Sequence, residues 1–240
     1  MRCIVKVCET LQIKLHSLIQ LRGLLLIISH KHKFVFIRVP KTGSTSCVFY
    51  FVDSGILGSN DNYAYKSIDK IKSKVKNTDS ETELKFSSED IEFTKYAHTK
   101  YKNLTMDFPQ VSDYECIAGI RNPVDRIISA ALMLSNTKAV SKKELNTTIQ
   151  FLLETKTVLS TPQHEYFRED STLWPTENLD ACISKFITSK NGSIRTNWRC
   201  RQNNAENYRA MLDISQIHNI ESQYAKDFEL WHLAIKNVKD

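Results

Sequence analysis

Residues 34–39 (FVFIRV) form a short, almost wholly apolar run that is followed at once by a polar loop and then by a second apolar run. The first run has the length of a strand, and its nearly continuous apolar character is typical of a parallel strand buried on both faces. The loop, residues 40–46 (PKTGSTS), contains a glycine among several hydroxyl side chains. Residues 47–52 (CVFYFV) fit the first turns of a helix that ends near Gly55. The order strand, loop, helix predicts half of a β-α-β unit.

The same order recurs at residues 115–121 (ECIAGIR), which we predict to be a second strand. Asn122 and Pro123 end it, and proline is well suited to the first position of a helix. Apolar residues then follow at helical spacing as far as Leu134. No internal repeat and no linker rich in proline, glycine or serine is evident, so we predict one α/β domain. Further helices are predicted over residues 144–154, 177–189 and 216–234.

The chain has 240 residues, of which 41% are hydrophobic and 25% are charged, and this composition excludes a disordered or collagen-like protein. We place the domain at residues 33–240 and treat residues 1–32 as an N-terminal extension. The uninterrupted apolar run of the extension covers only residues 24–28, because Arg22 breaks the longer stretch. A membrane span needs about 20 apolar residues. We therefore predict an extension packed on the domain, with a weak signal-anchor as the alternative.

The six cysteines form no C-x-x-C pair, and no group of cysteines and histidines has zinc-ligand spacing. We therefore predict no metal site and expect reduced, mostly buried thiols. A bridge between Cys182 and Cys200 is the alternative in an exported protein. The net charge of +6 suits an anionic ligand without naming one.

The loop at residues 40–46 has the features of an anion site. A loop between a buried strand and a helix aims backbone N–H groups and the positive end of the helix dipole at a bound phosphate. Gly43 allows close backbone approach, and Lys41 adds a positive charge. In the nucleotide-binding P-loop the lysine follows the second of two glycines, whereas here it precedes a single glycine, so Mg-ATP chemistry is disfavoured. The alternative is a turn whose hydroxyl side chains only cap the helix.

Residues 121–129 (RNPVDRIIS) supply a second group of polar side chains. Arg121 is predicted at the carboxyl edge of the sheet, where ligands bind in open α/β folds. Ser129 lies in the following helix, on the face that also carries Asp125 and Arg126. Arg121 and Ser129 together predict a second phosphate site. The alternative is a surface ion pair made by Asp125 or Arg126.

The two motifs together resemble those of a known enzyme family. The segment VPKTGSTS (39–46) resembles the 5′-phosphosulfate loop of the carbohydrate sulfotransferases. The segment IRNPVDRIISA (120–130) is similar to their 3′-phosphate motif, R-x-P-x-x-R-x-x-S. The order and spacing of the motifs suit the membrane-type branch, which contains the heparan and uronyl 2-O-sulfotransferases. The resemblance covers residues 33–135, with weaker traces at 163–167, 177–179 and 224–230.

The resemblance implies a P-loop-like three-layer fold with a central parallel sheet flanked by helices. It also implies 3′-phosphoadenosine 5′-phosphosulfate (PAPS) as co-substrate, without a metal. Lys41 would contact the sulfate and the bridging oxygen of the leaving phosphate, while Arg121 and Ser129 would hold the 3′-phosphate. The family tolerates alanine at the position of Gly43. The 5′-phosphate would be held by the loop residues Thr42, Gly43, Ser44, Thr45 and Ser46.

His98 is the predicted catalytic base. It lies between the two motifs, in a segment (YAHTKY, 96–101) that resembles the family's H-x-x-Y/F element, whose histidine is the base in the 2-O-sulfotransferase branch. Histidine that is neutral near pH 7 is well suited to accepting a hydroxyl proton. The alternative is a histidine with a structural hydrogen bond. His164 is the second candidate base. Glu92 and Glu115 are further alternatives for the base.

The resemblance implies a carbohydrate or glycan acceptor and gives no reason to expect nucleic acid. Sequons at Asn103, Asn146 and Asn191 are close in number to chance expectation and do not establish a secretory route. We expect the Golgi or secretory pathway for a eukaryotic source and the cytoplasm otherwise, with membrane association and oligomeric state left open. A late cluster either lines the acceptor cleft or forms a surface patch: Arg195, Trp198, Arg199 and Arg201.

The sequence thus predicts a sulfotransferase that moves a sulfuryl group from PAPS to a carbohydrate hydroxyl by in-line displacement, with Lys41 and His98 as catalytic residues. One alternative is a P-loop kinase-like phosphotransferase. The other is a non-catalytic module on the same fold that binds polyanions.

Overall fold

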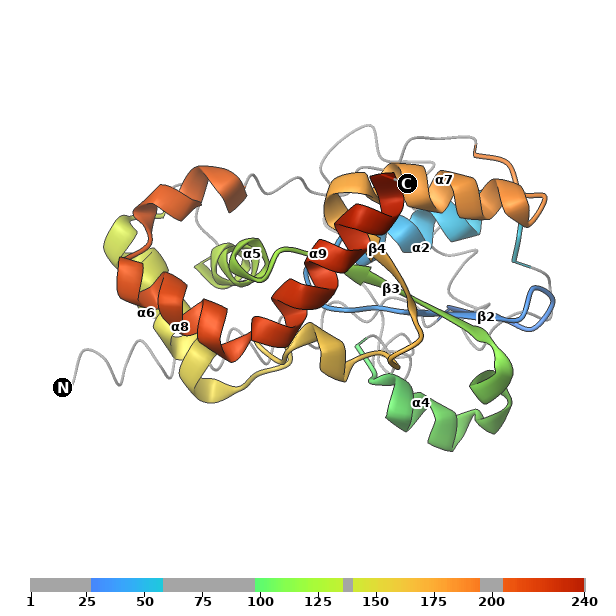
Figure 1. Cartoon of the computed structure of the whole chain (residues 1–240), viewed down its shortest axis with the longest axis horizontal. Coiled ribbons are helices and arrows are strands. Elements are labelled where there is room, and N and C mark those ends of the chain that lie inside the picture. Colours follow the sequence, from blue (N-terminus) through green and yellow to red (C-terminus); the bar gives the residue numbers. More distant parts are fainter. Residues whose placement is uncertain (1–26, 58–97, 136–139, 195–204, 240) are drawn as a thin grey trace, which may run out of the picture.

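The computed structural model describes residues 27–57, 98–135, 140–194 and 205–239 (Figure 1). Within them a four-stranded sheet has the order β1-β2-β3-β4. The last three strands are parallel to one another, and β1 is an antiparallel edge strand paired with β2. The strands are β1 (Ile27–Ser29), β2 (Phe34–Ile37), β3 (Glu115–Ile120) and β4 (Thr172–Pro175).

Helices connect and cover the strands. The α-helices are α2 (Ser44–Asp53), α4 (Tyr101–Asp107), α5 (Pro123–Ser135), α6 (Lys142–Thr155), α7 (Leu179–Ser189), α8 (Ile214–Gln223) and α9 (Ala225–Lys239). Short 3-10 helices are η3 (Pro109–Asp113), η4 (Gln163–Glu165), η5 (Thr176–Asn178) and η6 (Ala205–Met211).

The alternation of side chains along β2 builds two cores. Phe34 and Phe36 pack with residues of α2 and α7 on one face of the sheet. Val35 and Ile37 pack with residues of α4 and η3 on the other face. Because both faces are covered, every residue of β2 is buried and apolar, as the sequence predicted. Figure 1 shows α2 and α7 on one side of the sheet and α4 on the opposite side.

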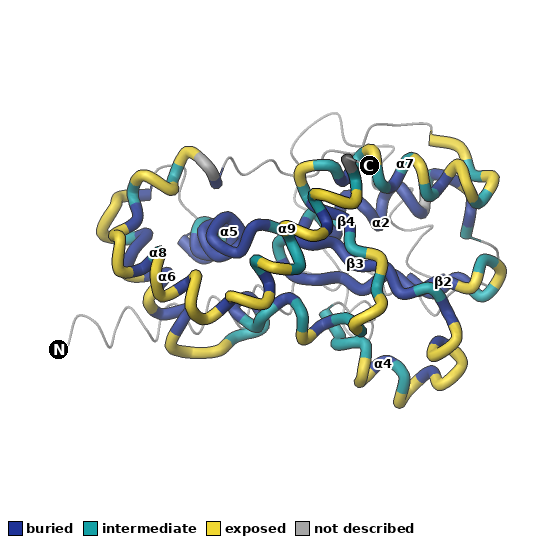
Figure 2. Tube along the Cα trace, in the orientation of Figure 1, coloured by how far each residue is buried: buried dark blue, intermediate teal, exposed yellow. Residues whose placement is uncertain are grey.

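A third core lies beyond the carboxyl end of β3, where α5 packs against α6, α8 and η6. Almost all of α5 is buried, including its polar residues (Figure 2). The outer helices α6 and α8 each expose one side to solvent. The helix that carries the second predicted motif is therefore held on several sides.

The predicted fold class is confirmed as a mixed α/β sheet flanked by helices. The edge strand β1 was not predicted, and it joins the sheet although it precedes residue 33, where we placed the start of the domain. The helix predicted to begin at residue 47 begins at Ser44 instead. The single helix predicted over 216–234 is two helices, α8 and α9, separated at Tyr224.

Other predictions concern residues outside the described ranges. These are most of the N-terminal extension, Glu92, the partner cysteine Cys200, and the cluster Arg195, Trp198, Arg199 and Arg201. None of the helices in the described part of the chain is both long enough and apolar enough to cross a membrane.

Candidate functional site

The two predicted motifs meet at the carboxyl edge of the sheet. The strands that precede them, β2 and β3, are adjacent and parallel, so both loops leave the sheet at the same edge. Nη1 of Arg121 donates to the backbone carbonyl oxygen of Lys41 at 3.4 Å. Residues 80 positions apart in the sequence are thus in contact.

The loop that ends at Gly43 has an unusual backbone. Lys41 has φ 67° and Gly43 has φ 75°, both in the left-handed region. That conformation is uncommon for a residue with a side chain, and such strain concentrates at functional sites. Gly43 is the N-cap of α2, and its left-handed backbone lets the helix start at Ser44.

The N-terminus of α2 carries no side-chain cap among the described residues. The N-cap residue is Gly43, which has no side chain, so no hydroxyl group occupies the N-cap position itself. The first turn of α2 also contains no acidic side chain. The positive end of the helix dipole is consequently not offset by a cap or a carboxylate within that turn.

Gly119 of β3 lies directly against the loop. A Cβ atom at Gly119 would lie 2.8 Å from Oγ1 and 3.0 Å from the carbonyl oxygen of Thr42, so the loop rests directly on the backbone of β3. The Thr42 hydroxyl donates to the carbonyl oxygen of Val39 at 2.9 Å, and Thr42 is fully buried. The Thr42 hydroxyl is therefore already used inside the loop.

The other predicted loop residues lie around the helix start. Ser44 and Ser46 are buried, and Lys41 and Thr45 are half-buried. The Lys41 ammonium nitrogen lies 3.8 Å from Sδ of Met133 on α5. Lys41 thus extends from the first motif toward the helix of the second.

Gln163 holds Arg121 in place. Its side-chain oxygen accepts from the Arg121 N–H at 3.0 Å, and its side-chain nitrogen donates to the Arg121 carbonyl oxygen at 2.8 Å. Asn122 then caps α5, because its Oδ1 accepts from the N–H groups of Val124 and Asp125. The backbone on both sides of the Arg121 side chain is therefore fixed.

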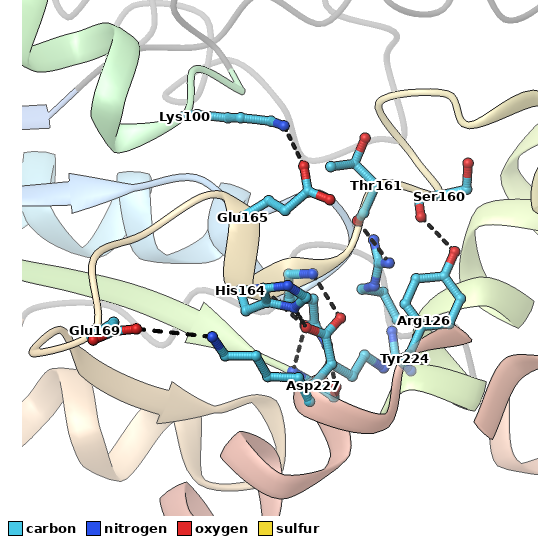
Figure 3. A network of polar contacts seen from close by, with 12 residues as sticks. Lys100, Arg126, Ser160, Thr161, His164, Glu165, Glu169, Tyr224 and Asp227 are labelled. Atoms are coloured by element: carbon cyan, nitrogen blue, oxygen red, sulfur yellow. Dashed lines mark hydrogen bonds and ion pairs between the residues drawn. The ribbon is translucent and has the colours of Figure 1, made fainter. Parts of the chain in front are cut away.

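A buried carboxylate on α9 orders this clamp (Figure 3). Asp227 is fully buried and accepts from the N–H groups of Gln163 at 2.6 Å and His164 at 2.9 Å. It also accepts from the Nδ1 of His164 at 2.7 Å. A helix far along the chain thereby reaches Arg121 through Gln163.

Of the two residues in the alternative interpretation, Asp125 forms an ion pair, with Arg209, and Arg126 has a different role. Arg126 is fully buried and donates to the carbonyl oxygens of Leu159 at 2.9 Å and Thr161 at 3.0 Å. Burial lowers the pKa of its guanidinium. Asp125 is buried as well and pairs with Arg209 at 2.6 Å. The motif arginine therefore ties α5 to the segment before η4.

Ser129 lies on α5 and is 2% exposed. Its predicted contact with a 3′-phosphate consequently requires a phosphate that is itself enclosed by protein.

The predicted base, His98, is attached to the first motif. Its Nδ1 lies 2.7 Å from the carbonyl oxygen of Arg38, the residue that follows β2. A carbonyl oxygen only accepts, so Nδ1 carries the proton and the lone pair of the neutral ring is on Nε2. His98 therefore makes the structural hydrogen bond of the alternative interpretation. The same bond fixes the tautomer in which Nε2 could act as a base.

The other candidate bases are placed differently. The His164 ring is held by Asp227, whose carboxylate fixes the tautomer in the same way. Glu115 lies at the amino end of β3, opposite the edge with both motifs, and it pairs with Lys190 at 3.6 Å. The position of Glu115 therefore disfavours it as the base.

The remaining predictions can be compared with the described residues. Cys47, Cys116 and Cys182 are free thiols, and burial raises the pKa of each. Asn146 is buried and donates to two backbone carbonyl groups, so the folded protein does not present it as a glycosylation acceptor. In the described ranges, no three His, Cys, Asp or Glu side chains are grouped so that they could hold a metal ion.

Comparison with known families agrees with the motifs. Residues 25–139 match the family model described as "Sulfotransferase family". The match supports the assignment of this region to a sulfotransferase family. The matched residues include both motifs, the strands β1 to β3 and the helix α5. No curated protein and no solved structure gives a significant match to the chain.

Sequence reasoning missed several residues of the site, and some of them had a signal. Arg38 is a charged residue in a run predicted to be buried on both faces, which already required an explanation. Asn122 directly precedes a proline at a helix start, the usual place of an N-cap. Gln163 and Asp227 fall within the weaker traces of the resemblance, at 163–167 and 224–230, but their role had no local signal because their partners are far away in the sequence.

Proposed function

We propose that this chain is a PAPS-dependent sulfotransferase that transfers a sulfuryl group to a hydroxyl of a carbohydrate acceptor. The observation that carries the proposal is the contact between the two motifs, in which Arg121 Nη1 lies 3.4 Å from the carbonyl oxygen of Lys41. Two cationic residues, Lys41 and Arg121, thus lie next to each other although they follow different strands. A donor with a 3′-phosphate and a 5′-phosphosulfate requires cations of this kind at two positions.

The residues present fit such a donor. The N-terminus of α2 offers backbone N–H groups without a side-chain cap among the described residues, which suits the 5′-phosphate. Arg121, fixed by Gln163 on both sides of its Cα, would hold the 3′-phosphate. When bound, PAPS supplies the sulfuryl group and a phosphate leaving group.

Two side chains would assist the transfer. Nε2 of His98, which carries the lone pair, would accept the proton of the acceptor hydroxyl as its oxygen attacks sulfur. The Lys41 ammonium would neutralise the charge that develops on the leaving phosphate oxygen. The proton thus stays on His98, and the products are a sulfate ester and adenosine 3′,5′-bisphosphate.

The four-stranded sheet with helices on both faces supports the finer proposal of a P-loop-like fold. Kinase-like phosphotransfer is the less favoured function, since the loop has its lysine before a single glycine. A non-catalytic module that binds polyanions is the other alternative.

Thermal unfolding with ligands tests the proposal. Adenosine 3′,5′-bisphosphate should raise the Tm without magnesium, and Lys41→Ala and Arg121→Ala should each reduce that rise. A shift that requires ATP and magnesium would favour the kinase, and no shift at millimolar bisphosphate would contradict the proposal. Transfer of labelled sulfate from PAPS to a panel of glycan, steroid and peptide acceptors then tests the acceptor class.

A further inference from the structure

The ammonium group of Lys41 contacts a thioether. Its Nζ lies 3.8 Å from Sδ of Met133, a residue 92 positions later in the sequence. Lys41 belongs to the loop before α2, Met133 lies on α5, and both residues are half-buried. The contact therefore joins the predicted catalytic lysine of the first motif to the helix of the second.

The backbone at each end of this contact is fixed. The helix α5 is buried along almost its whole length, and Met133 packs against the core that α5 forms with α6, α8 and η6. The carbonyl oxygen of Lys41 accepts from Arg121 at 3.4 Å. The Lys41 ammonium consequently reaches Met133 from a backbone that the fold holds in place.

Other lysines of the protein have partners of a different kind. Carboxylates pair with Lys100 at 2.5 Å, Lys142 at 3.0 Å and Lys190 at 3.6 Å. A carboxylate offsets the charge of a lysine, whereas a thioether is an uncharged and weak acceptor. The contact with Met133 thus orients the Lys41 ammonium without neutralising it.

A weak acceptor suits the role proposed for Lys41. The ammonium has to leave its partner when the oxygen of the leaving phosphate becomes negative. Charge-assisted hydrogen bonds to phosphate are roughly twice as strong as neutral ones, so a thioether contact is readily exchanged for such a bond. A strong oxygen acceptor at the same place would compete with the phosphate.

We propose that Met133 is a redox-sensitive positioning residue for Lys41. The inference rests on the proposed function, because the reaction that Lys41 assists is part of it. The reduced thioether holds the ammonium between the two motifs and releases it to the leaving phosphate. Oxidation to the sulfoxide replaces the weak acceptor by a polar oxygen, which holds the ammonium at α5 and slows transfer.

Hydrogen peroxide is the oxidant in this step. The sulfur lone pair attacks a peroxide oxygen, the O–O bond breaks as the S–O bond forms, and the departing hydroxide takes up the remaining proton as water. The sulfur is oxidised and the peroxide is reduced. Methionine sulfoxide reductases reverse the change, so the modification is reversible.

The reactivity of the Lys41 amine tests the positioning role independently of turnover. Wild type and Met133→Leu, each with and without hydrogen peroxide, are labelled with limiting acetic anhydride, and peptide mass spectrometry compares Lys41 with the exposed Lys142. Peroxide should lower the relative labelling of Lys41 by about threefold or more in the wild type, because a hydrogen bond to oxygen stabilises the protonated amine. Leucine has a similar volume and no acceptor, so labelling in Met133→Leu should not respond.

Two results of this labelling would overturn the proposal. One is unchanged labelling of Lys41 although the mass of its peptide shows that Met133 is oxidised. The other is a Met133 that peroxide does not oxidise.

Met106→Leu is the matched control. Met106 is 75% exposed on α4, so peroxide oxidises it as well, and its replacement should leave the response of Lys41 as in the wild type. A response that is lost in Met106→Leu as fully as in Met133→Leu would contradict the role of Met133.

Met133→Gln imitates the sulfoxide without an oxidant. Its amide oxygen supplies a strong acceptor on a side chain of similar length, so the labelling of Lys41 should be low before peroxide is added. The kcat for sulfate transfer from PAPS should fall by about tenfold or more in Met133→Gln and in the oxidised wild type, and the reductase should restore the latter. The Kd for adenosine 3′,5′-bisphosphate should change less than kcat, because the charge that Lys41 neutralises develops only during transfer. Wild-type labelling and turnover in Met133→Gln would contradict the proposal.

The two readouts separate this proposal from the proposed function. If the labelling of Lys41 responds as expected but no form of the protein transfers sulfate from PAPS, the positioning role stands and the proposed function fails. If the wild type transfers sulfate and peroxide slows Met133→Leu to the same extent, the function stands and the redox role of Met133 is wrong.

Discussion

The side-chain amide of Gln163 bonds both backbone groups of Arg121, with its oxygen 3.0 Å from the N–H nitrogen and its nitrogen 2.8 Å from the carbonyl oxygen. These are the two hydrogen bonds that a neighbouring strand would make, at the point where β3 has just ended. One buried side chain thus extends the order of the sheet to the residue proposed to hold the 3′-phosphate.

Gln163→Ala should destabilise the protein and weaken ligand binding together. It removes both side-chain hydrogen bonds to the backbone of Arg121, which should cost about 2–4 kcal/mol of unfolding free energy. The Kd for adenosine 3′,5′-bisphosphate should rise because Arg121 is no longer fixed. Urea unfolding and calorimetry check both effects. Gln150→Ala is the control, since the Gln150 side chain is exposed and donates to Glu154 on the same helix; equal results for the two variants would refute the clamp.

His98→Asn should separate binding from turnover. Asparagine can still donate to the carbonyl oxygen of Arg38, but it cannot accept a proton, so kcat should fall by about 10²–10⁴-fold. The Kd for the bisphosphate should not change. The measurement is sulfate transfer from PAPS beside equilibrium binding.

His164→Asn is the matched variant, because asparagine can likewise keep a contact with Asp227. We expect its turnover to stay close to that of the wild type. Loss of turnover in His164→Asn, with full turnover in His98→Asn, would assign the base to His164.

Gly43→Ala and Gly55→Ala should have similar effects on stability and different effects on binding. Both glycines have φ 75°, so alanine should cost about 1–2 kcal/mol at either position. At Gly55 a Cβ meets no atom within 4 Å, whereas at Gly43 it would lie 2.6 Å from Cδ2 of Leu179. Only Gly43→Ala should weaken bisphosphate binding. Unchanged binding in Gly43→Ala would contradict this prediction and would support instead the tolerance of alanine that the family resemblance implies.

Arg126→Met and Arg38→Met should change stability in opposite ways. Arg126→Met leaves the carbonyl oxygens of Leu159 and Thr161 without their donor, at a cost of about 3 kcal/mol. Arg38→Met replaces a buried cation, whose Nε and Nη1 have no hydrogen-bond partner among the described residues, by an apolar side chain, which is often neutral or stabilising. Urea unfolding of the unliganded variants measures both, and a larger loss for Arg38→Met would show that Arg38 is structural.

Stability should fall as the pH rises above about 9. Burial raises the pKa of Cys47 and Cys116 above the usual thiol value of 9.0, and it raises the pKa of Tyr166 to about 12. The folded protein keeps protons that the unfolded chain releases, so these groups contribute stability below pH 9 that is lost at higher pH. Arg38, with its pKa lowered to about 10, acts in the opposite direction only above that pH.

The Tm measured between about pH 8 and 10 checks this dependence. Cys47→Ala should lower the Tm at every pH through the lost packing, but it should also reduce the slope of Tm against pH. An unchanged slope would show that the Cys47 thiol does not contribute to the alkaline loss.

Some parts of the fold could be predicted because their signals are local. The two buried parallel strands, β2 and β3, were predicted to within two residues, because a strand covered on both faces is a short apolar run. Pro123 marked the first residue of α5 for a similarly local reason. By contrast, the break between α8 and α9 depends on Tyr224, which is buried against Arg126 and donates to the carbonyl oxygen of Ser160. That contact joins distant segments and leaves no periodic pattern.

The sequence by itself determined the two motifs that resemble cofactor-binding motifs, and their order, because phosphate recognition depends on a short loop and a helix start. Lys41, Gly43 and Arg121 were found in this way. Only the tertiary structure decided what the polar side chains do. It placed the Thr42 hydroxyl inside the loop, made Arg126 a buried structural residue, and left the buried donors of Arg38 unused. The physical reason is that a buried polar group depends on which partner the fold brings to it, and these partners lie on other elements of the chain.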